Sequence, residues 1–379
     1  MFPTTRIPLG NYPTPVERVD ALSSVSSVSS PSSVSSPSSP SSRSSRSSPS
    51  SRTELWIKRD DLTHDVYGGN KVRKLEYVLA EAREREKTRL VTVGAAGSHH
   101  VLATTYFGRR AGLTVEAVLV PQPRTEHVVE VLRADVALGL KAFPVSSWGA
   151  APFALVARAL SGAMLVTVGG SNVAGSMGYV DAARELAAQV RRGELPEPDI
   201  CVVALGSGGT AGGLAAGFAA EGLRTRVVGA CVSTPPWVLR ATSLLLARAC
   251  ARRAGVHGAE GSLAAMRARL SMDVRFLGRG YGFATEAGDE ATAVARDAAG
   301  ITLDPTYTAK AFACALWHVR ARRAPRILYW HTLSSAPMAP LLEGAPDETE
   351  LDVRLRALAL PPATRALTLD RLAFDRKDG

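Results

Sequence analysis

A lysine that follows a glycine turn is the residue of this chain best placed to do chemistry. Residues 68–71 read Gly-Gly-Asn-Lys and precede a stretch with helical periodicity over residues 75–85. A lysine amine with its ordinary pKa of about 10.4 is protonated at neutral pH, and only desolvation or nearby positive charge makes it nucleophilic. Arg73, Lys74 and the positive end of a helix dipole lie close in sequence to Lys71, so we expect them to lower its pKa. The alternative is a solvated lysine that opens a surface helix.

A second glycine-rich segment has the features of an anion site. A valine-rich stretch over residues 202–205 leads into Gly-Ser-Gly-Gly-Thr at 206–210. Glycines let backbone amides converge on an anion, and a helix start adds a favourable field, so a phosphate fits here. The same letters match a dinucleotide-binding loop, but that loop needs an acid about 20 residues further on, and residues 226–231 contain none. A Walker loop fails because no Gly-Lys-Ser/Thr follows, and the remaining alternative is a tight structural turn.

Histidines and tyrosines in three further segments add acid–base groups. Residues 97–100 read Gly-Ser-His-His, Tyr281 lies between two glycines, and Tyr307 lies in Leu-Asp-Pro-Thr-Tyr-Thr. A phenol at a cationic site can act as acid, base or nucleophile, and the alternative is a half-buried tyrosine with a satisfied hydroxyl. We expect no metal at His99 and His100, because adjacent side chains in a strand point apart and no carboxylate or cysteine is near.

Taken together, these segments resemble the pyridoxal-phosphate enzymes of the tryptophan-synthase-β-like fold. Within that group the chain is similar to the D-cysteine desulfhydrase and 1-aminocyclopropane-1-carboxylate (ACC) deaminase family. The motifs are Trp-Ile-Lys-Arg-Asp-Asp-Leu at 56–62, Gly-Gly-Asn-Lys-x-Arg-Lys at 68–74 and the loop at 206–210. The resemblance implies two open, mainly parallel α/β domains with pyridoxal 5'-phosphate between them, carried by Lys71 as a Schiff base.

The resemblance also assigns roles to individual residues. Ser98 matches a serine beside the cofactor and the substrate carboxylate, and the two tyrosines match residues that flank the substrate. The implied catalytic residues are Lys71, Ser98, Tyr281 and Tyr307. The implied cofactor-binding residues are Lys71, Asn70, His99, Gly206, Ser207, Gly208, Gly209, Thr210, Thr308 and Thr332.

Two positions depart from the family pattern, and a third is one at which deaminases and desulfhydrases of the family differ. His99 replaces an asparagine that hydrogen-bonds near the cofactor's phenolic oxygen, so that contact is either made by a neutral imidazole or lost. Leu333 follows Thr332 where the family has glycine, which adds bulk at the cofactor's edge. Thr308 stands where deaminases of the family have glutamate and desulfhydrases have threonine. We therefore expect a lyase that eliminates sulfide from D-cysteine or a related β-substituted amino acid; a deaminase or racemase, and a non-catalytic protein of this fold, are the alternatives.

Composition is that of a soluble enzyme. The 379 residues are 46% hydrophobic and 21% charged, and no apolar run approaches the roughly 20 residues that span a bilayer. The N-terminal residues lack a signal peptide's apolar stretch, so we expect a cytoplasmic protein. Four widely spaced cysteines indicate buried thiols. The net charge of +10 comes from arginines interleaved with acids, so we expect no nucleic-acid partner. A homodimer is implied by the resemblance alone.

Valine-rich runs that alternate with helical patterns set the domain organisation. Strands at 90–93, 115–120, 164–168 and 201–205 each precede a helix, starting after 100, at 125, at 179 and at 210. By the resemblance, residues 1–74 and 186–342 form the large domain, 75–185 the small one, and 343–379 a C-terminal extension. The serine-rich tract at 23–52 cannot bury enough apolar surface to fold, so we expect a disordered insertion.

Overall fold

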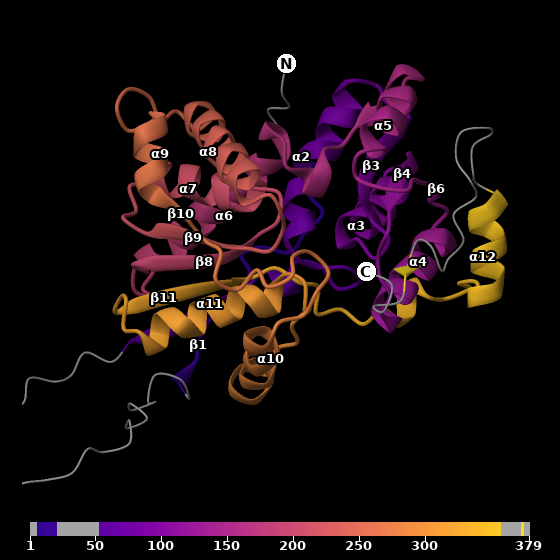
Figure 1. Ribbon diagram of the computed structural model, residues 1–379. Helices are drawn as coiled ribbons and strands as arrows, with labels where there is room; N and C mark the ends of the chain where they lie inside the picture. Colours follow the sequence, from indigo (N-terminus) through magenta and orange to yellow (C-terminus); the bar gives the residue numbers. More distant parts are fainter. Residues whose placement is uncertain (1–5, 21–52, 358–372, 375–379) are drawn as a thin grey trace, which may run out of the picture.

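The computed structural model describes residues 6–20, 53–357 and 373–374. The serine-rich tract at 23–52 lies outside these residues, so its disorder stays a prediction. Two sheets lie side by side in Figure 1, with helix α2 (Asn70–Glu84) between them. This arrangement confirms the α/β class with mainly parallel sheets.

The larger sheet has six strands, and all but one run parallel. Its order is β1 (Val16–Arg18), β2 (Glu54–Arg59), β11 (Arg326–His331), β8 (Ile200–Leu205), β9 (Arg226–Cys231) and β10 (Leu270–Asp273). Only β1 pairs antiparallel, with β2. One face packs on α6 (Val173–Arg191), α7 (Gly209–Ala220), α8 (Pro236–Arg253) and α9 (Leu263–Arg269), and the other on α10 (Glu286–Ala299) and α11 (Thr308–Arg320). The central strands β8 and β9 each contain two consecutive valines, which is typical of strands with both faces buried.

The smaller sheet has four parallel strands. Its order is β6 (Lys141–Pro144), β4 (Thr114–Val120), β3 (Arg89–Ala95) and β7 (Met164–Leu165). Its buried clusters draw on α2, α3 (His99–Arg110), α4 (Glu126–Ala137) and α5 (Ala151–Leu160). Short 3-10 helices lie at Asp60–Leu62, Val168–Gly170 and Ala339–Leu341.

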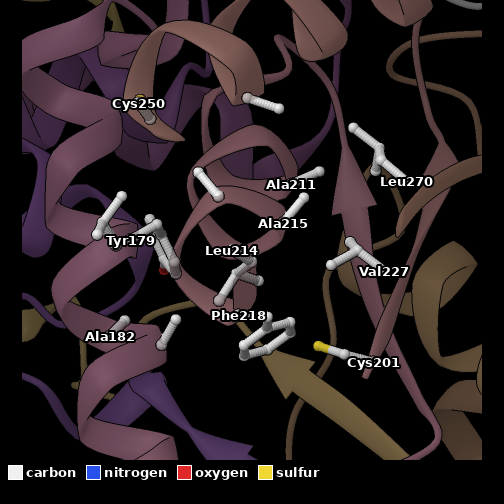
Figure 2. Close-up of a cluster of buried hydrophobic side chains, with 14 of the residues drawn as sticks. Tyr179, Ala182, Cys201, Ala211, Leu214, Ala215, Phe218, Val227, Cys250 and Leu270 are labelled. Atoms are coloured by element: carbon white, nitrogen blue, oxygen red, sulfur yellow. The ribbon is translucent and has the colours of Figure 1, made fainter. Parts of the chain in front are cut away.

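Small residues let the helices on one face of the larger sheet pack closely together. Figure 2 shows Tyr179 of α6 facing Leu214 and Phe218 of α7, with Val227 of β9 beyond them. Glycines let these helices approach closely: a Cβ at Gly213 would lie 2.3 Å from the Ser176 carbonyl oxygen. Such contacts place α7, and therefore the glycine loop before it, at a fixed position on the sheet.

The predicted strands at 90–93, 115–120 and 201–205 are confirmed as β3, β4 and β8. The strand predicted at 164–168 is shorter, since β7 ends at Leu165, and the helix predicted from residue 179 begins at Val173. Glycines at 175 and 178 caused the second error. Glycines at this spacing are typical of a loop. In the structure, however, a Cβ at Gly178 would lie 2.1 Å from the Arg73 carbonyl oxygen, so glycine is needed where α6 crosses α2.

The part of the C-terminal extension that is described lies on the smaller layer. Helix α12 (Glu348–Ala357) packs against α4, and β12 (Ala373–Phe374) pairs with β5 (Gln122–Pro123). All four cysteines are free and buried, as predicted. Among the described helices, none is long and apolar enough to cross a membrane. The domain boundaries, the cytoplasmic location and the homodimer stay predictions.

Candidate active site

A cleft lies between the two sheets, at the carboxyl ends of β3, β8 and β11. Ligands of open α/β sheets bind at such ends, because the loops that follow the strands converge there. The cleft wall contains nearly all the predicted site residues: Asn70, Lys71, Ser98, His99, Gly206, Ser207, Gly208, Thr210, Tyr281, Tyr307, Thr308 and Thr332. Gly209, the remaining one, opens α7 beside this wall.

Lys71 lies in the first turn of α2 and is held by its neighbour. Its Nζ donates a hydrogen bond of 2.6 Å to Asn70 Oδ1, while Asn70 Nδ2 donates to Thr210 Oγ1 at 3.3 Å. Asn70 therefore links the lysine to the glycine loop across the cleft. Desolvation lowers the pKa of Lys71 to about 8, although the carboxylate of Asp304 acts in the opposite direction. About a tenth of this amine is therefore neutral at pH 7, whereas an ordinary lysine is almost entirely protonated.

Arg73 does not lower the pKa of Lys71 as its place in the sequence suggested. Its guanidinium is buried, donates to both oxygens of Asp60 (2.7 and 3.0 Å) and pairs with Glu185 at 2.9 Å. The positive charge is thus neutralised on the far side of α2. Lys74 does face the cleft, where its Nζ donates to the Gly169 carbonyl oxygen (3.0 Å). Burial, with the nearby Lys71, holds the pKa of Lys74 well below its ordinary value, so Lys74 does not supply the fixed positive charge that the sequence suggested.

The loop at 206–210 has the geometry of an anion cradle. Gly208 adopts φ 95°, a left-handed conformation that favours glycine, and α7 starts directly after it. Ser207 Oγ lies 2.7 Å from Ser171 Oγ, and Ser171 Oγ accepts from the Gly209 amide at 3.1 Å. Amides of a first helical turn have no intrahelical acceptor, so they can serve a phosphate.

The chemistry of these donors fits pyridoxal phosphate. The cofactor requires an amine that can be neutral, a phosphate site of amides and hydroxyls, and a partner for the ring nitrogen. Lys71, the loop at 206–210 and Thr308 supply one of each within a single cleft.

Thr308 is bound to a carboxylate that sequence reasoning did not single out. Its Oγ1 donates to Asp304 Oδ2 at 2.6 Å and accepts from the Asp304 amide at 2.7 Å. The other carboxylate oxygen of Asp304 accepts from the amides of Thr306 and Tyr307 (2.9 and 2.7 Å). An aspartate four residues before a helix start is a capping signal, but only the fold shows that it also polarises Thr308.

Tyr281 and Tyr307 lie in contact on one side of the cleft. The Tyr307 hydroxyl donates to that of Tyr281 at 2.9 Å, and the rings pack edge to face with centroids 5.5 Å apart. Desolvation raises the pKa of Tyr281 to about 12 and that of Tyr307 still further above its ordinary value. Both phenols are therefore protonated at neutral pH and act as donors.

His99 and His100 start helix α3 and do not lie in a strand, so the reason given against a metal pair was wrong. Their rings nevertheless have separate partners. His100 Nε2 lies 2.8 Å from Thr92 Oγ1, whereas His99 Nδ1 lies 2.7 Å from the Tyr67 hydroxyl and Nε2 lies 2.9 Å from His127 Nε2. Both ring nitrogens of His99 thus have protein partners, which leaves neither directed at a cofactor oxygen in this arrangement.

Ser98 and the segment after β11 face the cleft and also make hydrogen bonds to the backbone of neighbouring segments. Ser98 Oγ caps α3 by accepting from the Val101 amide at 3.4 Å. The Thr332 carbonyl oxygen accepts from the Asn70 amide (3.1 Å), and Ser334 Oγ accepts from the Gly68 amide (2.9 Å). Leu333 lies on the cleft wall, where its side chain occupies space that a glycine would leave open. The residues that sequence reasoning missed are Tyr67, His127 and Asp304; of these, only Asp304 has a local sequence signal.

Comparisons with known proteins identify the family of this chain. Residues 38–332 match the family described as pyridoxal-phosphate dependent enzyme. The chain belongs to this family. It is 31% identical over 281 residues to the D-cysteine desulfhydrase of Salmonella schwarzengrund (strain CVM19633), which covers 69% of this chain and 79% of that protein. The corresponding protein of Salmonella paratyphi A is likewise 31% identical.

Solved structures place this pyridoxal-phosphate enzyme in the same fold. A crystal structure of an ACC deaminase homologue matches with a TM-score of 0.70 and 26% identity, over 90% of this chain and 96% of that one. Threonine deaminase isoform 2 from Solanum lycopersicum, at 15% identity and a TM-score of 0.57, shows the fold alone. The protein is therefore a pyridoxal-phosphate dependent enzyme of the D-cysteine desulfhydrase and ACC deaminase type.

Proposed function

We propose that this enzyme eliminates the β-substituent of D-cysteine or a related small amino acid, which yields pyruvate, ammonia and sulfide. The observation that carries the proposal is the pairing, in one cleft, of the Lys71 amine of lowered pKa with a threonine at position 308. The relatives named D-cysteine desulfhydrase support it. A thiolate leaves easily, so the reaction does not require a carboxylate directly on the cofactor's ring nitrogen.

The proposed roles follow from where each group lies. When bound, pyridoxal phosphate supplies an aldehyde that joins an amine and a ring that withdraws electrons. Lys71 Nζ takes the α-proton, and Asn70 orients that amine through its 2.6 Å contact. Ser98 and nearby amides hold the substrate carboxylate. Tyr281 and Tyr307 flank the substrate as hydrogen-bond donors, and the loop at 206–210 holds the phosphate.

A reaction of the ACC deaminase type is the second candidate, and Asp304 is the residue that supports it. Its carboxylate accepts a hydrogen bond of 2.6 Å from the Thr308 hydroxyl. This bond makes the threonine oxygen a better acceptor for a protonated ring nitrogen than the oxygen of an isolated hydroxyl. This makes the ring a stronger electron sink than Thr308 alone would. A racemase on the same site would need the same sink and no leaving group.

The test is product analysis of the protein loaded with pyridoxal phosphate. D-Cysteine, L-cysteine and ACC are supplied separately, and sulfide, pyruvate, 2-oxobutyrate and the enantiomeric amino acid are measured. The Lys71→Ala variant is the test of the lysine, and Lys141→Ala, which changes an exposed lysine of β6, is its control.

Sulfide and pyruvate from D-cysteine, lost only in Lys71→Ala, are the expected results. 2-Oxobutyrate from ACC, or formation of the opposite enantiomer, would transfer the assignment to the deaminase or the racemase. Absence of the visible absorbance band that forms when pyridoxal phosphate joins a lysine would overturn an active role for this cleft.

A further inference from the structure

A line of hydrogen-bonding side chains connects the cleft with solvent. The Tyr67 hydroxyl lies 2.7 Å from His99 Nδ1, His99 Nε2 lies 2.9 Å from His127 Nε2, and His127 Nδ1 lies 3.5 Å from a carboxylate oxygen of Glu130. Tyr67 is 2% exposed, whereas the side chains of His127 and Glu130 are 43% and 36% exposed. The line therefore begins in the buried wall and ends at the surface.

The members of this line come from separate segments, so their alignment is a product of the fold. Tyr67 precedes α2, His99 opens α3, and both His127 and Glu130 belong to α4. Tyr67 and His99 line the cofactor cleft and also an adjoining cavity, whose wall includes His127. The two imidazoles lie with ring centroids 4.9 Å apart and an interplanar angle of 33°.

Each contact in the line can carry a proton in either direction. A neutral imidazole has one N–H donor and one acceptor nitrogen, so His99 can receive a proton at one nitrogen while it releases one from the other. The Tyr67 hydroxyl also lies 3.2 Å from the His99 carbonyl oxygen. This second acceptor lets the Tyr67 proton turn away from the ring, so His99 Nδ1–H can donate to the same phenol oxygen.

Burial, together with nearby positive charge, favours the neutral form of the His99 ring. Burial is the main cause that lowers its pKa, and positive charge on His127 and on Lys71 acts in the same direction. Asp304 opposes them, and Tyr67 remains protonated because burial raises its pKa. A neutral, doubly hydrogen-bonded imidazole is the form that can transmit a proton without holding one.

We propose that Tyr67, His99 and His127 form a proton relay between the cleft and solvent. The proposal rests on the elimination proposed above. In that reaction the bond between the β-carbon and sulfur breaks, its electron pair leaves with sulfur, and the departing sulfide takes the Tyr67 proton. Tyr67 regains a proton from His99 Nδ1, His99 Nε2 takes one from His127 Nε2–H, and His127 Nδ1 takes one from water, which leaves hydroxide in the solvent. One solvent proton is thus delivered to sulfur, and no oxidant or reductant is needed.

His127→Gln breaks the relay at its exposed end, and His257→Gln, at an exposed histidine outside the line, is the matched control. A positioned acid–base side chain contributes roughly 10²–10⁴-fold to a rate. We expect kcat in His127→Gln to fall at least about tenfold with little change in KM, its pH profile to change shape, and added imidazole to restore part of the rate. An unchanged kcat and pH profile would overturn the relay.

A second measurement does not depend on turnover. NMR of the imidazole nitrogens in the cofactor-free protein reports which ring nitrogen carries the proton. The His99 signals are expected to move in His127→Gln and to stay in place in His257→Gln. If the parent releases no sulfide, the proposed elimination is refuted, but this measurement still tests the relay. His99 signals that are the same in the parent and in His127→Gln would refute the relay.

Discussion

Replacement of Lys71 by methionine is expected to stabilise the cofactor-free protein at neutral pH. Desolvation lowers the pKa of this amine to about 8, from 10.5 in a free side chain. This difference of about 2.5 pH units corresponds to about 3.4 kcal/mol, at about 1.36 kcal/mol for each. Loss of the hydrogen bond to Asn70 offsets about 1 kcal/mol of the gain. The free energy of unfolding should therefore rise by about 2–3 kcal/mol at neutral pH.

The sign of the pH dependence follows from where the proton is held. The unfolded chain keeps the Lys71 proton up to about pH 10.5, whereas the folded chain loses it near pH 8. Unfolding therefore takes up a proton between these values, and the parent gains stability as pH rises through this window. The advantage of Lys71→Met should be complete below about pH 8 and should vanish near pH 10.5.

The assay is urea unfolding of the cofactor-free parent and of Lys71→Met at neutral pH and at about pH 10. Lys141→Met, at an exposed lysine, is the control and should show no such pH-dependent advantage. Equal stability of parent and variant at neutral pH would refute the reasoning, because the buried amine would then cost nothing. A gain that is the same at both pH values would refute it as well, since the benefit would come from methionine packing alone.

Three further changes test the supports of the site. Arg73→Met leaves the buried Asp60 carboxylate without its partner and should lower the free energy of unfolding by about 3–5 kcal/mol in urea titrations; an unchanged midpoint would contradict this role. Gly208→Ala forces a side chain into φ 95° with its Cβ 2.8 Å from Ser243 Oγ, so pyridoxal phosphate should bind about tenfold more weakly in a fluorescence titration. Gly193→Ala, with φ 77° and no atom within 4 Å, is its control and should bind normally. Asp304→Asn keeps the size of the side chain but removes the charge behind Thr308, and kcat should fall about 10-fold or more while the cofactor stays bound; full activity would show that the threonine acts alone.

Several parts of the fold and site follow from short stretches of sequence. Valine-rich runs predicted β3, β4 and β8, and the glycines at 206–210 predicted the loop that precedes a helix start, because strand burial and left-handed backbone are local properties. Lys71 was identified in the same way, from a glycine turn before a helix. Its neighbour Arg73 was assigned the wrong effect, since sequence distance says nothing about which side of α2 a guanidinium faces.

The tertiary structure alone decided the electrostatics and the hydrogen-bond partners of the site. The pKa of Lys71 depends on how much protein surrounds it, which no local pattern records. His99 meets Tyr67, 32 residues before it, and His127, 28 residues after it, so its role could not be read from the Gly-Ser-His-His segment. Sequence determined which chemical groups this protein has and the local backbone that presents them. Burial and long-range packing determined which of those groups share a proton, because both depend on segments that meet only when the sheets come together.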